Sequence, residues 1–443
     1  ETWQLASNVL VFFGLLLSLI TLLAMFLADP LVNLLAPDFS DIPGKHELTT
    51  LLTRIMLPFL IFISLAAVVM GILNAKGKFF VPAMASTFFN MGSIIGGVSL
   101  ALILPRYGQP AIVGMAIGTL LGGMLQLLMQ YPSLSSCGFR FIPRLRLNDP
   151  GLKRIVTLMI PAVIGLSPTQ INIFINTNFA SSCAEGSVSW LNYAFRLVQL
   201  PIGVFGVALS IATLPVLARH AAQKDLSSMK ETMVSSLTMV FGLTIPASLG
   251  LMLLAEPIIH IIFERGAFTA FDTTATANTL ILYSVGLFAY SANKILVPVF
   301  YALEDTKYPV IGAFLAVAAN ILIINLTIAP LQHLAIALST SCSMVLNFLF
   351  LSSVLYLKTG GYSIAYLLKG LLKITIAGFA MALFLFWSRS FFSSMLTSGL
   401  LQAVSVLLLI IVTGAFIYGL LLHIMGLHEF TEVTGKIHGK FRR

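Results

Sequence analysis

The residues best suited to chemistry are two cations placed deep in apolar segments. Arg196 lies in the run NYAFRLVQLPIGVFGVA, and Gln199 follows about one helical turn later on the same face. Lys294 lies in YSANKILVPVF. Ionisable groups at such depth are costly to bury and usually mark the path of a ligand or ion. A guanidinium can bind phosphate or pyrophosphate oxygens through two hydrogen bonds, so Arg196 is a candidate for meeting such an anion.

Each cation also has a structural interpretation. Arg196 could be paired with a buried carboxylate, but no acidic residue lies at comparable depth in the sequence. The flexible stem of Lys294 could carry its amine to the membrane interface. The sequence favours the ligand-binding interpretation for Arg196 and leaves both interpretations open for Lys294.

Amide side chains form a polar stripe in the apolar segment that contains residues 152–180. Gln170, Asn172 and Asn176 cover one broad helical face. Hydrogen bonds between helices would account for this stripe, and so would a cavity wall that binds sugar or peptide groups. In later segments the residues that could add a cation site are Asn320, Asn325 and Thr340. No carboxylate accompanies them, which argues against a tight sodium site.

Bond-making chemistry is not indicated by any motif. The chain has no Walker loop, no Ser-His-Asp set and no paired catalytic carboxylates. Its seven histidines and three cysteines do not cluster, so we expect no metal site and no disulfide framework. The sequence therefore indicates no bond chemistry and no cofactor. A membrane protein of this kind that moves a ligand would be driven by the membrane potential or by a monovalent cation.

The composition identifies the class of protein that positions these residues. Hydrophobic residues make up 58% of the 443 residues and charged residues only 9%, and the mean hydropathy is +0.98. Soluble domains contain about 25% charged residues. The net charge of +9 is spread over short loops, which fits anionic lipid headgroups rather than nucleic acid. We expect an all-α integral membrane protein.

Twelve apolar runs are long enough to cross a bilayer. They cover residues 9–35, 48–74, 79–104, 110–131, 152–180, 187–218, 232–262, 274–300, 308–328, 333–357, 364–387 and 397–424. Most contain Pro or Gly, which membrane helices tolerate where neighbouring helices or a water-filled cavity satisfy the freed backbone groups. This pattern favours a bundle that moves or encloses a cavity.

The distribution of Lys and Arg predicts the orientation. With Glu1 on the cytoplasmic side, eighteen Lys and Arg residues fall in cytoplasmic loops and the C-terminal tail, against four on the other side. The C-terminus is then cytoplasmic. We expect an N-terminal group of four helices, a cytoplasmic linker, a lobe of six helices, a further helix pair and a basic cytoplasmic tail, at residues 1–132, 133–150, 151–357, 358–425 and 426–443.

Three segments carry a family resemblance. They are LLTRIMLPFLIFISLAAVVMGILNAKGKFFVPAMAST (51–87), the segment 161–215 with SVSWLNYAFRL and QLPIGVFGVAL, and the segment 264–310 with ERGAFTAFDTTAT. Together they resemble the MurJ (MviN) lipid II flippases of the MOP exporter superfamily. The run SVSWLNYAFRL with QLPIGVFGVAL is the most specific part of this resemblance.

The resemblance implies a fold of fourteen helices, with two six-helix lobes around a central cavity and two more helices that hold a polyprenyl tail. It implies that the chain flips an undecaprenyl-pyrophosphate-linked peptidoglycan precursor across the bacterial cytoplasmic membrane by alternating access. The implied partners are this precursor, membrane lipids and other cell-wall synthesis proteins. Arg196 matches a cavity arginine of the family, whose expected role is to meet the pyrophosphate.

The sequence departs from the family in two ways. Phe195 and Gln199 stand where some members carry acidic residues, and the first two family helices have no counterpart before Glu1. Two alternatives therefore stay open. An exporter of another lipid-linked oligosaccharide or of a cationic drug is one, although a drug exporter should carry deep carboxylates. An inactive, truncated membrane scaffold is the other, although it should carry large cytoplasmic loops.

Overall fold

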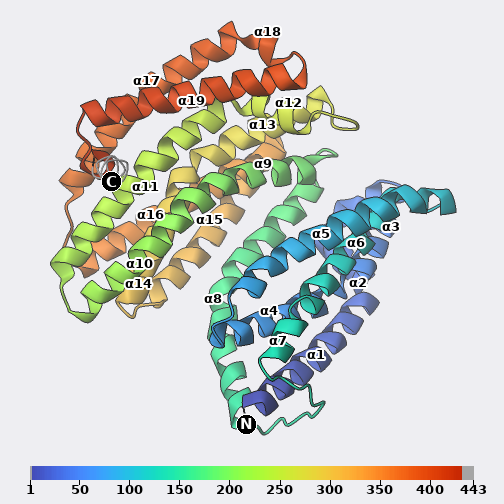
Figure 1. Ribbon diagram of the computed structural model, residues 1–443. Helices are drawn as coiled ribbons and strands as arrows, with labels where there is room; N and C mark the ends of the chain where they lie inside the picture. Colours follow the sequence, from blue (N-terminus) through green and yellow to red (C-terminus); the bar gives the residue numbers. More distant parts are fainter. Residues whose placement is uncertain (1, 432–443) are drawn as a thin grey trace. The chain divides into compact units, whose positions relative to one another are not determined.

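The computed structural model describes residues 2–431, and within them it is helical, with no β-strand (Figure 1). Ten helices are long and apolar enough to cross a membrane, or up to twelve if each of two bent pairs counts as one span. The predicted class and the predicted number of spans are confirmed. Most of the predicted basic tail, residues 432–443, lies outside the described residues.

The chain divides into two compact units, of which the first covers Glu1–Leu166. Its helices are α1 (Thr2–Phe26), α2 (Ala28–Leu35), α3 (Lys45–Met56), α4 (Phe59–Ala75), α5 (Phe80–Ile103), α6 (Ala111–Leu128), α7 (Tyr131–Ser136) and the first part of α8 (Pro150–Ser181). Two 3-10 turns, η1 (Pro37–Asp41) and η2 (Leu104–Tyr107), complete it.

Glycines bring α5 and α6 into backbone contact. A Cβ atom on Gly118 would lie 2.3 Å from the Cα of Gly97, and one on Gly114 would lie 2.3 Å from the backbone nitrogen of Ala101. Any larger side chain at Gly114 or Gly118 would push the helices apart. Lipid gives helices no hydrophobic reason to associate, so such small-residue contacts supply the packing instead.

The segment that follows α7 is hydrogen-bonded to α1. The Asn8 side chain pairs with both backbone groups of Arg146, donating to its carbonyl at 2.9 Å and accepting from its N–H at 2.7 Å. Ser7 makes similar contacts with the backbone of Arg140 and Ile142. Ser7 and Asn8 are both buried. These bonds give the polar segment a defined path along the first unit.

The second unit covers Ser167–Arg443. After the end of α8 it contains α9 (Ser187–Pro201), the π-helical turn η3 (Ile202–Val207), α10 (Ala208–Ala222), α11 (Leu226–Leu253), α12 (Ala255–Phe263), α13 (Ala270–Val285), α14 (Leu287–Ala302), α15 (Lys307–Leu331), α16 (His333–Lys358), α17 (Ile364–Phe391), α18 (Ser393–Leu396) and α19 (Leu400–Ile424). Helices α17 and α19 form a hairpin that packs beside α11 (Figure 1).

Prolines in this unit free backbone carbonyls that other helices then satisfy. A proline has no N–H, so the carbonyl four residues earlier loses its helical donor. Pro246 in α11 leaves the carbonyl of Gly242 free, and the hydroxyl of Tyr418 in α19 donates to it at 2.7 Å. This satisfies a backbone group that lipid could not satisfy.

The same compensation occurs twice more. Pro298 in α14 frees the carbonyl of Lys294, which accepts a hydrogen bond from Ser210 of α10 at 2.6 Å. Pro257 in α12 frees the carbonyl of Leu253, which accepts one from the Arg389 guanidinium of α17 at 3.2 Å. The predicted tolerance of helix breaks therefore has a specific side-chain donor at each of these sites.

Candidate functional site

A cavity of about 510 Å³ lies among the helices of the second unit. It is lined by side chains of α8, α9, η3, α13, α14 and α16. Apart from one lysine, its polar lining consists of neutral amide and hydroxyl groups, and no carboxylate is among the lining residues. Such a wall can bind a polar headgroup inside a bundle that is otherwise apolar.

The structure brings five of the predicted site residues together in this lining. They come from α8, α9, α14 and α16, and are Asn172, Asn176, Gln199, Lys294 and Thr340. Asn320 of α15 is fully buried behind the wall. The other three predicted residues, Gln170, Arg196 and Asn325, are exposed and are not among the lining residues.

Four of the polar residues form one hydrogen-bonded chain across three helices. The Thr340 hydroxyl donates to the carbonyl of Ile336 at 2.8 Å and accepts from the Asn176 amide nitrogen at 3.3 Å. The Asn320 amide nitrogen donates to the side-chain oxygens of both Asn172 and Asn176, at 2.7 Å in each case. This chain ties α8 to α15 and α16.

The chain of bonds also fixes which way each amide points. The Thr340 hydroxyl donates its only hydrogen to a backbone carbonyl, so it can only accept from Asn176. The Asn176 amide nitrogen therefore points toward Thr340, and its oxygen accepts from Asn320. The Asn320 N–H groups therefore lie where a bound cation would meet the oxygens of Asn172 and Asn176. Asn325, the third predicted cation-site residue, instead donates to the carbonyl of Ile321 in its own helix at 2.8 Å.

Lys294 is the charged residue of the cavity lining. Its backbone carbonyl is the one freed by Pro298 and bound by Ser210, so the helix is held locally at the point where the side chain leaves it. Its amine forms no hydrogen bond or ion pair with the described residues. A cation without a protein partner in such a cavity is available to an anionic ligand.

Arg196 lies at the edge of the cavity face of α9. Asn192 and Gln199, which lie one helical turn before and after it, both line the cavity, as does its neighbour Phe195. The Arg196 side chain is exposed and forms no hydrogen bond or ion pair with the described residues. Its guanidinium is thus free for a ligand, next to the lining of this cavity.

Tyr283 and Tyr290 also line the cavity, although they are not among the predicted site residues. They lie seven residues apart, which is two helical turns, at the junction of α13 and α14. The two helices bend by 41° there. Gly286 stands at this bend, and a Cβ on it would lie 2.7 Å from the Cα of Ser341. In the sequence, the only sign of these two cavity residues is the spacing of the tyrosines around a glycine. This sign is weak because tyrosines are common in membrane helices.

The π-helical turn η3 supplies Ile202, Gly203 and Val207 to the same lining. It follows Pro201, the last residue of α9. Gly206 in this turn lies against α14, where an added Cβ would approach Ser291 at 3.1 Å. Single π-helical turns often occur at functional sites, and this one places α14 and its Lys294 beside α9.

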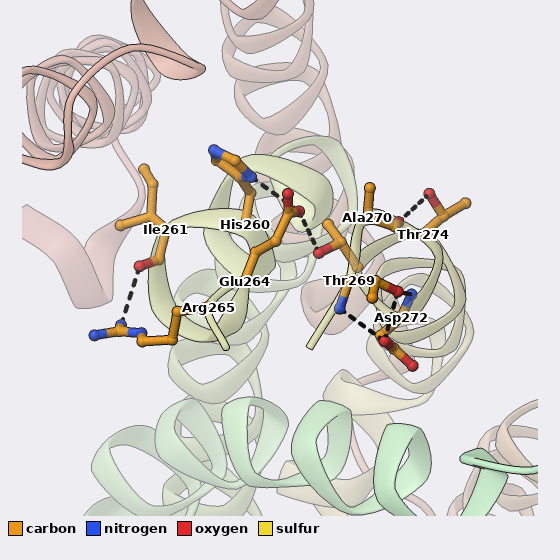
Figure 2. Close-up of polar contacts among 9 residues, drawn as sticks. His260, Ile261, Glu264, Arg265, Thr269, Ala270, Asp272 and Thr274 are labelled. Carbon is orange, nitrogen blue, oxygen red and sulfur yellow. Dashed lines mark hydrogen bonds and ion pairs between the residues drawn. The ribbon is translucent and has the colours of Figure 1, made fainter. Parts of the chain in front are cut away.

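A second polar cluster joins the end of α12 to the start of α13 (Figure 2). Glu264 accepts a hydrogen bond from Thr273 at 2.5 Å and contacts the His260 ring at 2.9 Å. The Thr273 bond and, after it, His260 lower the pKa of Glu264 below its ordinary value. Figure 2 also shows Thr269 and Asp272, which cap α13 reciprocally. These contacts organise the loop, and their residues are not among those that line the cavity.

Comparisons with known proteins agree with this arrangement. The family model described as lipid II flippase MurJ matches residues 1–407. A probable lipid II flippase from Vibrio cholerae is 36% identical over 86% of this chain and 72% of the relative. A probable lipid II flippase from Bdellovibrio bacteriovorus is 34% identical over 85% of this chain and 71% of the relative.

Solved structures give the same answer. A structure of a lipid II flippase MurJ in an inward closed conformation has a TM-score of 0.77 and 26% identity, and covers 96% of this chain and 84% of that chain. An inward-facing multidrug transporter of the MATE family shares the fold at 17% identity, with a TM-score of 0.66 over 79% of this chain and 80% of that chain. The resemblance to the MurJ family seen in the sequence is thereby confirmed, and the chain belongs to the MurJ family of lipid II flippases.

Proposed function

We propose that this chain carries lipid II, a lipid-linked peptidoglycan precursor, from the inner to the outer leaflet of the bacterial cytoplasmic membrane by alternating access. Membership of the family supports the proposal, because its curated relatives bear the name lipid II flippase. The observation that carries it is the position of Lys294, an unpaired cation in a cavity lined otherwise by neutral polar and apolar groups.

The physical task explains this combination. A pyrophosphate that enters a membrane interior without compensating charge faces a very large desolvation penalty. Lys294 offsets part of the negative charge of the pyrophosphate. Arg196, at the edge of the cavity face of α9, can add a bidentate hydrogen-bonded contact. Asn172, Asn176 and Gln199 then replace the water around the neutral part of the headgroup. Gln170, exposed on α8, extends this polar face.

The polyprenyl tail stays in lipid during this movement. The α17–α19 hairpin offers large apolar side chains on its outer face, among them Phe379 at 65% and Trp387 at 70% exposure. We assign this face to the tail. The polar headgroup would then bind in the cavity, while the apolar tail lies along a separate apolar face.

The lining also bears on the alternative functions. A site for a cationic drug needs a carboxylate, and none is among the residues that line this cavity. An exporter of another lipid-linked oligosaccharide would share the cation and the amides, so the choice of headgroup has to be tested with defined lipids.

We assign the driving force to the membrane potential. The oxygens of Asn172 and Asn176 are already bound by the Asn320 N–H groups, so a monovalent cation would first have to displace them. An empty cavity that holds Lys294 and Arg196 carries positive charge, and a potential positive outside would help return it inward by about 2.3 kcal/mol per charge per 100 mV. The positive-inside distribution of Lys and Arg in the sequence favours a cytoplasmic C-terminus, and cell-wall synthesis proteins are candidate partners on that side.

The test replaces Lys294 with Met or with Arg in cells depleted of their own flippase. Lys294→Met removes the charge, and we expect transport of lipid II to fall tenfold or more, since a hydrogen bond to a charged group contributes about 1.5 to 3 kcal/mol. Lys294→Arg keeps the charge and should retain more transport. Lys307→Met, which removes an exposed lysine at the start of α15, is the matched control. Growth and lipid II accessibility equal to the unaltered chain in Lys294→Met would contradict the proposal.

A further inference from the structure

Two tyrosine hydroxyls in the cavity wall have no partner in the part of the chain that the structure describes. Tyr283 on α13 is 8% exposed, and Tyr290 on α14 is half-buried. Both line the cavity. Neither hydroxyl forms a hydrogen bond with the described residues. Each tyrosine therefore offers the cavity a polar group within an otherwise apolar bundle.

Three other tyrosines of the same unit have partners for their hydroxyls. The hydroxyl of Tyr418 donates to the carbonyl of Gly242 at 2.7 Å, and that of Tyr366 donates to Glu429 at 2.8 Å. The hydroxyl of Tyr362 lies 2.5 Å from that of Ser352. Buried tyrosine hydroxyls normally find such partners, and a membrane offers no water to replace them. Tyr283 and Tyr290 have no such partner among the described residues, and they line the cavity instead.

Phe195 holds both rings in place. Its ring centroid lies 5.3 Å from that of Tyr283 and 6.2 Å from that of Tyr290, in tilted and edge-on arrangements. This aromatic contact fixes the rings while leaving their hydroxyls free. It also gives a role to Phe195, which stands where some family members carry an acidic residue.

The neighbouring groups indicate the chemistry of the ligand. Tyr283 and Tyr290 share the lining with the neutral amides of Asn172 and Asn192 and with the hydroxyl of Thr177. The amides can donate and accept hydrogen bonds, and the Thr177 hydroxyl, whose hydrogen goes to the carbonyl of Ile173 at 2.9 Å, can accept one. Such a set suits sugar hydroxyls and acetamido or peptide amides. A phosphate oxygen only accepts, and Lys294 is the group suited to it.

We propose that Tyr283 and Tyr290 form a subsite for the neutral sugar and amide part of the headgroup, distinct from the contact between Lys294 and the pyrophosphate. This inference rests on the proposed function. It predicts that the two hydroxyls distinguish a lipid that bears a sugar headgroup from one that ends at the pyrophosphate.

The test measures binding to the purified chain in nanodiscs with two probes, lipid II and undecaprenyl pyrophosphate. Tyr283→Phe and Tyr290→Phe each remove only an oxygen and keep the ring contacts with Phe195. We expect each to weaken lipid II binding about five- to tenfold. Binding of undecaprenyl pyrophosphate should stay unchanged, because that lipid lacks the groups that the hydroxyls would bind.

Tyr418→Phe is the matched control, since it removes a hydroxyl that is already paired inside the protein. It should lower thermal stability and leave the affinity for both lipids unchanged. Lipid II binding unaffected by both cavity substitutions, or an equal loss for the two probes, would overturn the subsite. If the unaltered chain binds neither lipid, the proposed function fails, and the subsite fails with it.

Discussion

Two regions of the second unit differ in whether their polar groups are paired within the protein. Along the seam between α11–α12 and the α17–α19 hairpin, the carbonyls freed by Pro246 and Pro257 each accept a hydrogen bond from a side chain of the hairpin. In the cavity wall, the hydroxyls of Tyr283 and Tyr290 and the amine of Lys294 have no partner within residues 2–431.

The difference separates stability from function. A buried polar group that is paired within the protein holds helices together, and removing its partner costs the full desolvation of the group left behind. A polar group that lines the cavity and has no partner there contributes nothing to the fold and is available to a ligand. We therefore expect substitutions at the seam to change stability, and those in the cavity to change binding.

The largest effect on stability should come from Tyr418→Phe. It leaves the buried carbonyl of Gly242 without a donor, next to a proline that cannot restore the helical bond. We expect the free energy of unfolding to fall by about 1 to 3 kcal/mol. Thermal unfolding of the purified chain in detergent measures this. Tyr283→Phe, which removes an unpaired hydroxyl, should not lower stability. An equal loss of stability in the two variants would contradict the distinction between paired and unpaired hydroxyls.

A smaller effect is expected from Arg389→Met. The guanidinium donates to the carbonyl of Leu253 at 3.2 Å and to the Glu256 carboxylate at 2.5 Å. The ion pair is exposed, at 41% for Arg389 and 55% for Glu256. Water and salt screen such a pair, so the loss should be about 0.5 to 1 kcal/mol. Unfolding should be followed at low and high salt.

Glu256→Gln separates the two contacts of Arg389. It weakens the ion pair and leaves the bond to the Leu253 carbonyl in place, so its effect should be smaller and should vanish at high salt. A loss in Glu256→Gln as large as that in Arg389→Met would mean that the carbonyl bond contributes nothing to the seam.

Hydropathy and charge in the sequence predict much of this molecule. Apolar runs give the spans, because a bilayer demands helices of a minimum length. Lys294, Asn172 and Asn176 stand out because charged and amide side chains are rare at such depth. These signals depend only on the local sequence, so they can be read without knowing how the helices pack.

Hydrogen-bond partners on different helices are not predictable from such local signals. The hydroxyl of Tyr418 donates to the carbonyl of Gly242, which lies 176 residues away in the sequence. No local sequence pattern around either residue predicts this pairing. Tyr283 and Tyr290 resemble any tyrosines of a membrane helix until the bend at Gly286 and the contact with Phe195 turn them to the cavity. Asn325 and Asn320 have the same chemistry, yet one bonds to its own helix and the other joins the amide chain.

The smallest effect should come from a paired group at the surface, where water screens it. Glu264 is hydrogen-bonded by Thr273 and lies beside His260, and both contacts lower its pKa in the folded chain (Figure 2). Since the folded pKa lies below the unfolded one, its stabilisation is complete above the unfolded pKa of about 4.3 and is lost as pH falls through the folded value. Glu264→Gln should therefore unfold at slightly lower temperature than the unaltered chain at neutral pH, and this gap should close in acid. The control is Glu304→Gln, at an exposed position in the loop before α15. A gap that widens in acid would mean that Glu264 is not held ionised by its neighbours, and that paired groups at this surface do not follow the rule seen at the seam.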